Sequence, residues 1–151
     1  MLFRKILLTA CMSLFFLTSA NATSLLQEMS GHEFAFTDLH GKWVLINYWA
    51  SWCQPCVDEI PELNRFYDAN KQNNIAMYAV NYDALPINAQ KILIKQFNIR
   101  YPSLKEDPSD TLRLGDIRGV PVTFVFNPQG ELSDTLYGGQ TMSSLRAAVA
   151  Q

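Results

Sequence analysis

The stretch from Trp43 to Cys56 reads WVLINYWASWCQPC and decides the fold. Its first seven residues, Trp43–Trp49, form an apolar run interrupted only by Asn47, which predicts a buried β-strand. From Val57 to Asn73 the apolar residues recur at helical spacing, so a helix is expected close behind the cysteines. The sequence therefore predicts a strand that leads, through a short turn carrying two cysteines, into a helix.

Cys53 and Cys56 lie where the apolar strand ends and the helix begins. At a helix start, unpaired backbone N–H groups and the positive end of the helix dipole both favour a thiolate over a thiol. Cys53 is therefore the candidate nucleophile. Cys56, about one helical turn later, is near enough to close a disulfide and is the candidate resolving thiol. Because the Cys53–Cys56 pair can itself exchange two electrons between its dithiol and disulfide forms, no further cofactor is expected.

The remaining pattern predicts an α/β fold with one sheet. Apolar runs indicate strands at 34–36, 75–80, 122–126 and 131–137, and helical spacing indicates helices at 89–97 and 141–150, with one or two turns at 111–114. The turn Asn127-Pro128-Gln129-Gly130 between the last two strands indicates a hairpin. Strands that first alternate with helices and then pair through a hairpin predict a central mixed sheet flanked by helices on both faces.

The first 22 residues have the composition of a secretory signal. Arg4 and Lys5 precede an apolar stretch from Ile6 to Thr18, and small residues follow it. The stretch has 13 residues, fewer than the roughly 20 that span a bilayer as a helix. We therefore expect residues 1–22 to be a cleaved signal peptide and the mature protein to reach a bacterial periplasm. The alternative is cleavage and lipidation at Cys11.

Residues 23–151 are expected to form a single domain, because no linker, repeat or low-complexity tract interrupts them. The chain is 48% hydrophobic, which argues against an intrinsically disordered protein. Its formal net charge of -2 and its lack of a Lys/Arg run argue against nucleic-acid binding. The segment from Thr23 to Phe34 is too short for a dimerisation domain, so a monomer is expected.

The sequence from Asn47 to Pro61, NYWASWCQPCVDEIP, together with Gly119-Val120-Pro121 before a later strand, resembles the TlpA/ResA group of thioredoxin-like thiol-disulfide oxidoreductases. This group includes the cytochrome c maturation thioredoxins. The resemblance runs from about Phe34 to the C-terminus and implies a thioredoxin fold with an extra strand-and-helix insertion in mid-chain. The 68 positions from Cys53 to Pro121 leave space for this insertion.

The resemblance also implies which residues meet the substrate. Pro121 matches the cis-proline that faces the active-site disulfide, and such a bond leaves the Val120 backbone free to pair with an extended substrate. Gln54 and Pro55 lie between the cysteines and are expected to contact the same substrate. Trp52 is expected either to pack in the core or to form part of the docking surface.

Proton transfer needs a different residue from the one in typical thioredoxins. Those proteins have a buried Asp six residues before the first cysteine, whereas this chain has Asn47, which cannot titrate. Glu59 follows Cys56 by three residues on the same predicted helix and matches the acidic residue assigned this role in the ResA-like group. We expect a partly desolvated Glu59 to accept the proton of Cys56. The alternative is that Glu59 is a solvated helix residue like Asp58.

The residues between the cysteines predict a reductant. A strong oxidant of the DsbA type has a histidine there and a potential near about -120 mV, whereas thioredoxin lies near about -270 mV. Gln54 and Pro55 offer no cation, so a potential nearer that of thioredoxin is expected. The resemblance then implies a membrane electron donor of the DsbD type and an oxidised cysteine-pair substrate, with apocytochrome c as the leading candidate. A general disulfide oxidant is the alternative.

Copper or zinc transfer is an alternative from another class of function. The two cysteines could form a Cys2His2 site with His32 and His40. The spacing of the four residues is unlike known zinc ligand patterns, so both histidines are expected at surface turns and no metal site is expected.

Overall fold

The structure of the protein is a computed structural model that describes residues 24–150. The expected signal segment 1–22, with Cys11, lies outside the described residues. The strands are β1 (Leu25–Gln27), β2 (Glu33–Ala35), β3 (Trp43–Trp49), β4 (Ile75–Asn81), β5 (Val122–Phe126) and β6 (Leu132–Tyr137). The helices are the 3-10 helix η1 (Phe36–Leu39) and the α-helices α1 (Gln54–Asn70), α2 (Ile87–Gln96) and α3 (Met142–Ala148). None of these described helices is both long and apolar enough to cross a membrane.

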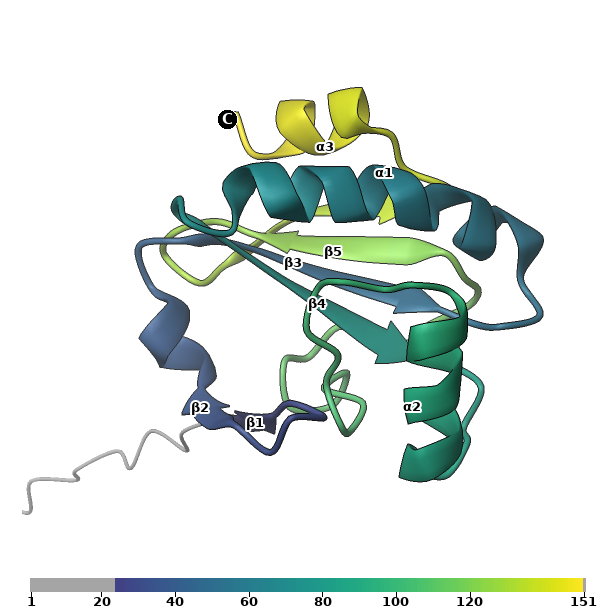
Figure 1. The fold of residues 1–151 in the computed structure, drawn as a ribbon. Coiled ribbons are helices and arrows are strands. Elements are labelled where there is room, and N and C mark those ends of the chain that lie inside the picture. Colours follow the sequence, from purple (N-terminus) through teal and green to yellow (C-terminus); the bar gives the residue numbers. More distant parts are fainter. Residues whose placement is uncertain (1–23, 151) are drawn as a thin grey trace, which may run out of the picture.

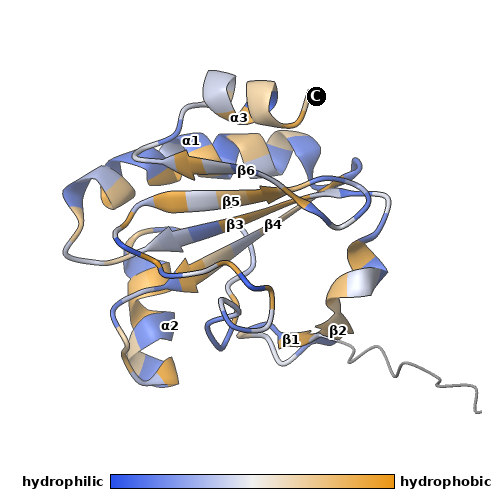
Figure 2. Ribbon diagram, turned by 180° about the vertical axis from the view of Figure 1, so that it is seen from behind, coloured by the Kyte–Doolittle hydropathy of each residue, from blue (hydrophilic) through white to orange (hydrophobic). Residues whose placement is uncertain are grey.

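The main sheet is mixed, as the sequence predicts. Its strand order is β4-β3-β5-β6, with β3 parallel to β4 and antiparallel to β5. β5 and β6 pair as the predicted hairpin. The side chains of β3 from Val44 to Trp49 are buried, which suits a strand covered on both faces. β4 and β5 are largely orange in Figure 2, whereas α1 and α2 alternate between blue and orange, as amphipathic helices do.

One face of the sheet is covered by α-helices. α1 and α3 lie side by side over this face (Figure 1). Leu63 and Phe66 of α1 and Leu145 of α3 belong to the same buried cluster as Leu45 of β3. α2 adds Phe97 from its C-terminal end, whose ring packs edge-on against Trp49 at 5.7 Å between centroids. This layer holds α1, and with it both cysteines, against the C-terminal end of β3.

The opposite face has a different cover. β1, β2 and η1 lie below it in Figure 1, and the segment that follows α2 completes the layer. The covering side chains are Leu26, Phe34, Phe36, Leu39, Leu104 and Leu114. Helices therefore stand on both faces, but the second face has only the one short 3-10 helix among the described residues. Turns without a helix occupy residues 109–113, whereas the sequence predicts one or two helical turns at 111–114.

The expected mid-chain insertion is present as α2 and a minimal strand. Ser103 bridges Ala79 of β4 in parallel, and Leu104 bridges Glu28 after β1 in antiparallel fashion. Backbone bonds on both sides reinforce these bridges, since the Leu104 N–H donates to the Ala79 carbonyl at 2.9 Å and the Met29 N–H donates to the Ser103 carbonyl at 2.8 Å. The insertion therefore links the small β1-β2 sheet, whose first strand the sequence pattern did not reveal, to the main sheet.

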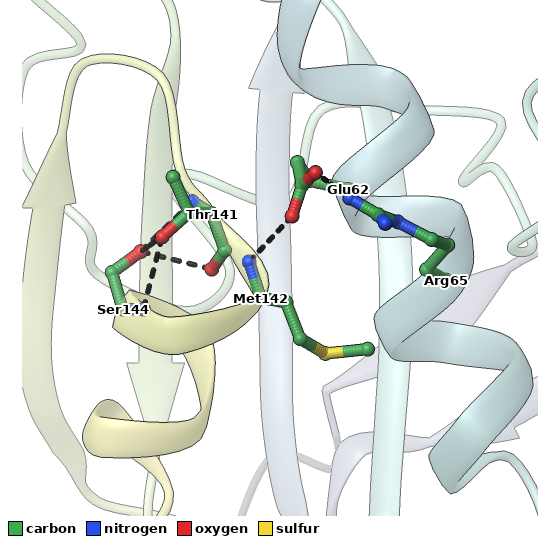
Figure 3. A network of polar contacts seen from close by, with 5 residues as sticks. All are labelled: Glu62, Arg65, Thr141, Met142 and Ser144. Carbon is green, nitrogen blue, oxygen red and sulfur yellow. Dashed lines mark hydrogen bonds and ion pairs between the residues drawn. The ribbon is translucent and has the colours of Figure 1, made fainter.

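A carboxylate on α1 caps the start of α3. Glu62 accepts the Met142 N–H at 2.9 Å and forms an ion pair with Arg65, while Thr141 and Ser144 close a capping box on the same helix start (Figure 3). The negative charge faces the positive end of the α3 dipole, where it is stabilising. This contact fixes α3 on α1, and so fixes the turn before α3 that reaches the active site.

Replacing Glu62 by Ala is expected to lower the free energy of unfolding by about 1 kcal/mol, because the Met142 amide loses its charged acceptor. Urea unfolding of the oxidised protein measures this loss. Arg65→Ala is the matched control, because it removes the exposed ion pair but keeps the cap, and it should cost less than about 0.5 kcal/mol. Equal losses in the two variants would show that the ion pair, and not the cap, is the stabilising contact.

Candidate active site

The two cysteines form a disulfide at the start of α1, with their Cα atoms 5.3 Å apart. α1 begins at Gln54, three residues earlier than the apolar spacing predicts, so Cys53 is the N-cap residue of the helix. The Cys56 N–H donates to the Cys53 sulfur at 3.3 Å, which satisfies one of the amides that a helix start leaves unpaired. Amide donation and the helix dipole therefore both favour a Cys53 thiolate once the disulfide is reduced.

The loop before β5 meets the disulfide. The Val120–Pro121 peptide bond is cis, as the resemblance implies. The Val120 carbonyl oxygen lies 3.5 Å from the Cys53 sulfur. Pro121 is buried, and its carbonyl accepts the Gly138 N–H at 3.0 Å, which ties the loop to the end of β6. The fold thus brings the predicted residues Val120 and Pro121 against the candidate nucleophile.

Glu59 is buried beneath the start of α1, with only 3% of its surface exposed. The interpretation of Glu59 as a solvated helix residue is therefore wrong. Its Oε1 accepts from the Asn47 side-chain amide at 2.8 Å, and its Oε2 accepts the Gln140 N–H at 2.7 Å. Burial raises the pKa of Glu59 to about 7, although the hydrogen bonds from Gln140 and Asn47 each pull it down. A carboxyl with this pKa exchanges protons near neutral pH.

Asn47 fixes the orientation of that carboxylate. Its amide nitrogen also donates to the Thr123 hydroxyl at 3.0 Å, and its carbonyl oxygen accepts the Tyr101 hydroxyl at 3.1 Å. All three partners are buried. Tyr101 stays protonated because burial, together with the nearby Glu59 charge, raises its pKa well above its ordinary value. The amide is therefore held with its N–H group towards Glu59 and its oxygen towards Tyr101.

The residues around the cysteines divide into exposed and buried sets. Trp49, at the end of the predicted buried strand, is buried, whereas Trp52 is 68% exposed, so the expectation that Trp52 packs in the core is wrong. Gln54 and Pro55 are exposed, and the Gln54 side-chain amide donates to Asp58 at 2.7 Å. An exposed indole beside a reactive sulfur is available to an incoming polypeptide.

The two histidines lie away from the cysteine pair. His40 precedes β3, near Gly130 of the β5-β6 hairpin, whereas Cys53 follows the other end of β3. Seven residues of strand at ~3.3 Å each separate these ends by about 20 Å. His32 stacks on Phe34 in the small sheet. Within residues 24–150, no group of three potential ligands could hold a metal ion, and the Cys2His2 arrangement is not formed.

Four residues that the sequence analysis did not single out belong to the site. Tyr101, Thr123 and Gln140 surround Asn47 and Glu59, as described above. Asp83 accepts both the backbone N–H and the hydroxyl of Ser51 in the turn before the cysteines, at 2.9 Å each. A polar residue inside each of two neighbouring apolar strands, Asn47 and Thr123, is the sequence signal that could have indicated a buried polar cluster.

The fold and the cysteine geometry define a class: this is a thioredoxin-like thiol-disulfide oxidoreductase. The chain belongs to the AhpC/TSA family, whose model matches residues 18–135.

Named relatives agree with this assignment and with the resemblance to the ResA group. The chain is 28% identical over 120 residues to the thiol-disulfide oxidoreductase ResA of Geobacillus kaustophilus, covering 80% of this chain and 68% of that protein. StoA from Bacillus subtilis superposes with a TM-score of 0.68 at 24% identity, over 82% of this chain and 92% of that chain. A thiol:disulfide interchange protein of Chlorobium tepidum superposes with a TM-score of 0.67 at 25% identity, over 83% and 89% respectively.

Proposed function

We propose that this protein reduces disulfides in exported proteins of a bacterial periplasm, with apocytochrome c as the leading substrate. The observation that carries the proposal is the Cys53–Cys56 disulfide at the start of α1, above the buried carboxylate of Glu59. A negative charge near the pair disfavours thiolates and therefore stabilises the disulfide over the dithiol. Gln54 and Pro55 supply no opposing cation. A cysteine pair whose disulfide is hard to reduce is a good electron donor once it has been reduced.

The reaction proceeds in two exchanges. The Cys53 thiolate attacks one sulfur of the substrate disulfide, whose S–S bond breaks as a Cys53–substrate disulfide forms, and the released substrate sulfur takes up a proton. The Cys56 thiol then loses its proton, and its thiolate attacks the Cys53 sulfur. The mixed disulfide breaks, the Cys53–Cys56 disulfide re-forms, and the second substrate sulfur leaves and is protonated. Two electrons have passed from the cysteine pair to the substrate.

Glu59 is the proposed acceptor of the Cys56 proton. It lies three residues after Cys56 on α1, so both side chains are on nearly the same face of the helix. Its pKa of about 7 lets it be ionised before the transfer and release the proton afterwards. The exposed Trp52, Gln54 and Pro55 and the Val120 backbone would contact the substrate chain, as strand addition at the loop before β5 requires.

The supply of electrons defines the other partner. A reductant in an oxidising compartment must itself be reduced, and a dithiol of a membrane electron transporter of the DsbD type would supply the electron pair. The signal-like composition of residues 1–22 supports export to that compartment.

The decisive experiment replaces Cys56 by Ser in cells. Without the resolving thiol, Cys53 should keep its substrate as a mixed disulfide that a reducing agent releases. The double variant lacking both thiols is the control and should capture nothing. Capture of a protein carrying a Cys-x-x-Cys-His haem-attachment motif supports the proposal. Capture only of other disulfide proteins would contradict apocytochrome c as the substrate.

The direction of electron flow is tested separately on the purified protein. Equilibration with glutathione should give a potential nearer about -270 mV than about -120 mV. A value close to the latter would make the protein an oxidant and would reverse the proposed role.

A further inference from the structure

The turn that precedes the nucleophile is held by one carboxylate. Asp83 accepts the Ser51 N–H through Oδ2 and the Ser51 hydroxyl through Oδ1, both at 2.9 Å. Ser51 stands two residues before Cys53, so this paired contact fixes the backbone that leads to the reactive sulfur. The two carboxylate oxygens of Asp83 bind Ser51 at two points, which restricts the rotation of Ser51 as well as its position.

Asp83 is itself held in place. The Asn81 side-chain amide donates to Asp83 Oδ2 at 2.7 Å, and the Asp83 N–H donates back to the Asn81 side-chain Oδ1 at 3.1 Å. Between them, the Tyr82 N–H donates to the Trp49 carbonyl at 2.8 Å, while the Tyr82 hydroxyl donates to the Ile117 carbonyl at 2.9 Å. Residues 81–83 therefore join the turn carrying Cys53 to the loop that leads to Val120 and Pro121.

The charge of Asp83 is held against the segment that leads to the Cys53 sulfur. The carboxylate accepts the Ser51 N–H at 2.9 Å, and the two residues from Ser51 to Cys53 span about 7 Å of chain at most. The other ionisable groups on the neighbouring segments include Asp58 and the buried Glu59 on α1, and the exposed Asp116 and Arg118 on the loop before Pro121. Asp58 is bonded to the Gln54 side chain, and Glu59 to Asn47 and Gln140, whereas Asp83 accepts a backbone N–H of the turn that precedes Cys53.

We propose that Asp83 is a positioning residue that holds the turn before Cys53 and, through its negative charge, opposes formation of the Cys53 thiolate and so makes the cysteine pair a stronger reductant. The inference rests on the proposed function, because it explains how that reducing character arises. A helix start alone favours the thiolate and would raise the potential. Asp83, bonded to the turn before Cys53, offsets that effect.

The test compares neutral variants of Asp83 in a glutathione equilibrium. In both Asp83→Asn and Asp83→Ser, the equilibrium constant should move about tenfold towards the dithiol, which equals about 30 mV for a two-electron couple. Alkylation of Cys53 should also begin at lower pH, because the thiolate forms more easily. A merely structural role would move neither quantity in this direction.

Two controls separate charge from contact. Asp110→Asn removes one exposed carboxylate outside the active-site loops and should leave the equilibrium constant within about twofold. Ser51→Ala keeps the Asp83 charge but loses the hydroxyl contact, so it should slow exchange and shift the equilibrium far less than Asp83→Asn. If both Asp83 variants match Asp110→Asn, the inference is wrong. This outcome is independent of capture by Cys56→Ser, which tests the proposed function.

Discussion

Replacing Glu59 by Gln is expected to slow disulfide exchange at pH 7 by about 10²-fold, the low end of what a positioned general base contributes. Gln has nearly the same shape but cannot take the proton of Cys56. The rate of the second exchange in the wild type should rise with pH through about 7, because Glu59 must be ionised to accept the proton. In Glu59→Gln this rise should be absent. Stopped-flow measurement of substrate release from the mixed disulfide gives both quantities.

Asp58→Asn is the control for this variant. Asp58 stands one residue earlier on α1 but is exposed, so its loss should change the rate by less than about threefold. A Glu59→Gln protein that keeps both its rate and its inflection near pH 7 would rule out Glu59 as the proton acceptor.

The sequence predicts the fold well because its signals are local. The apolar run ending at Trp49, the adjacent cysteine pair and the Asn127–Gly130 turn each specify one element with its neighbours. These local elements are enough to fix β3, α1 and the β5-β6 hairpin. Three-residue strands give weak signals because so short a run has no measurable alternation: β1 was missed, and β2, which spans Glu33–Ala35, was predicted one residue late at 34–36.

The chemistry of the site is only partly local. The cysteine pair and Glu59 can be read from helical spacing, because their relation depends on a single helix. The partners of Glu59 cannot be read from helical spacing. Gln140 lies 81 residues away along the chain, and Tyr101, which bonds Asn47, lies 54 residues from it. Whether Glu59 faces water or the sheet depends on where α1 packs, and its pKa follows from that packing and not from its neighbours in sequence.

Asn47 explains how a charge is tolerated in this interior. Typical thioredoxins have an ionisable Asp there, and a second carboxyl beside Glu59 would make the two titrate as a coupled pair. Here Asn47 instead donates to Glu59 while Tyr101 holds its oxygen. Both oxygens of Glu59 therefore face N–H donors, so the ionised form is satisfied although it is buried. With Asn47 in this position, Glu59 is the single titratable carboxyl here and not one of a coupled pair.

The burial of Glu59 should make the oxidised protein less stable as the pH rises. The pKa of Glu59 is about 7 in the folded protein, whereas the ordinary pKa of a glutamate, expected in the unfolded chain, is 4.5, so between these limits the folded state binds more protons than the unfolded state. The free energy of unfolding therefore falls across this window, by about 3 kcal/mol in total, and the loss is complete above pH 7. Tyr48 and Tyr101 add nothing here, because burial raises their pKa values and keeps them neutral.

Glu59→Gln isolates this effect because it lacks the titration. Urea unfolding of both disulfide-bonded proteins at pH 4 and pH 8 gives four free energies. The stability of the variant relative to the wild type should improve by about 3 kcal/mol from pH 4 to pH 8, whatever constant difference the substitution itself introduces. Other carboxylates contribute equally to both proteins and cancel in this comparison. Parallel pH profiles would mean that Glu59 titrates as it does in water, and its assignment as a proton acceptor near neutral pH would lose its physical basis.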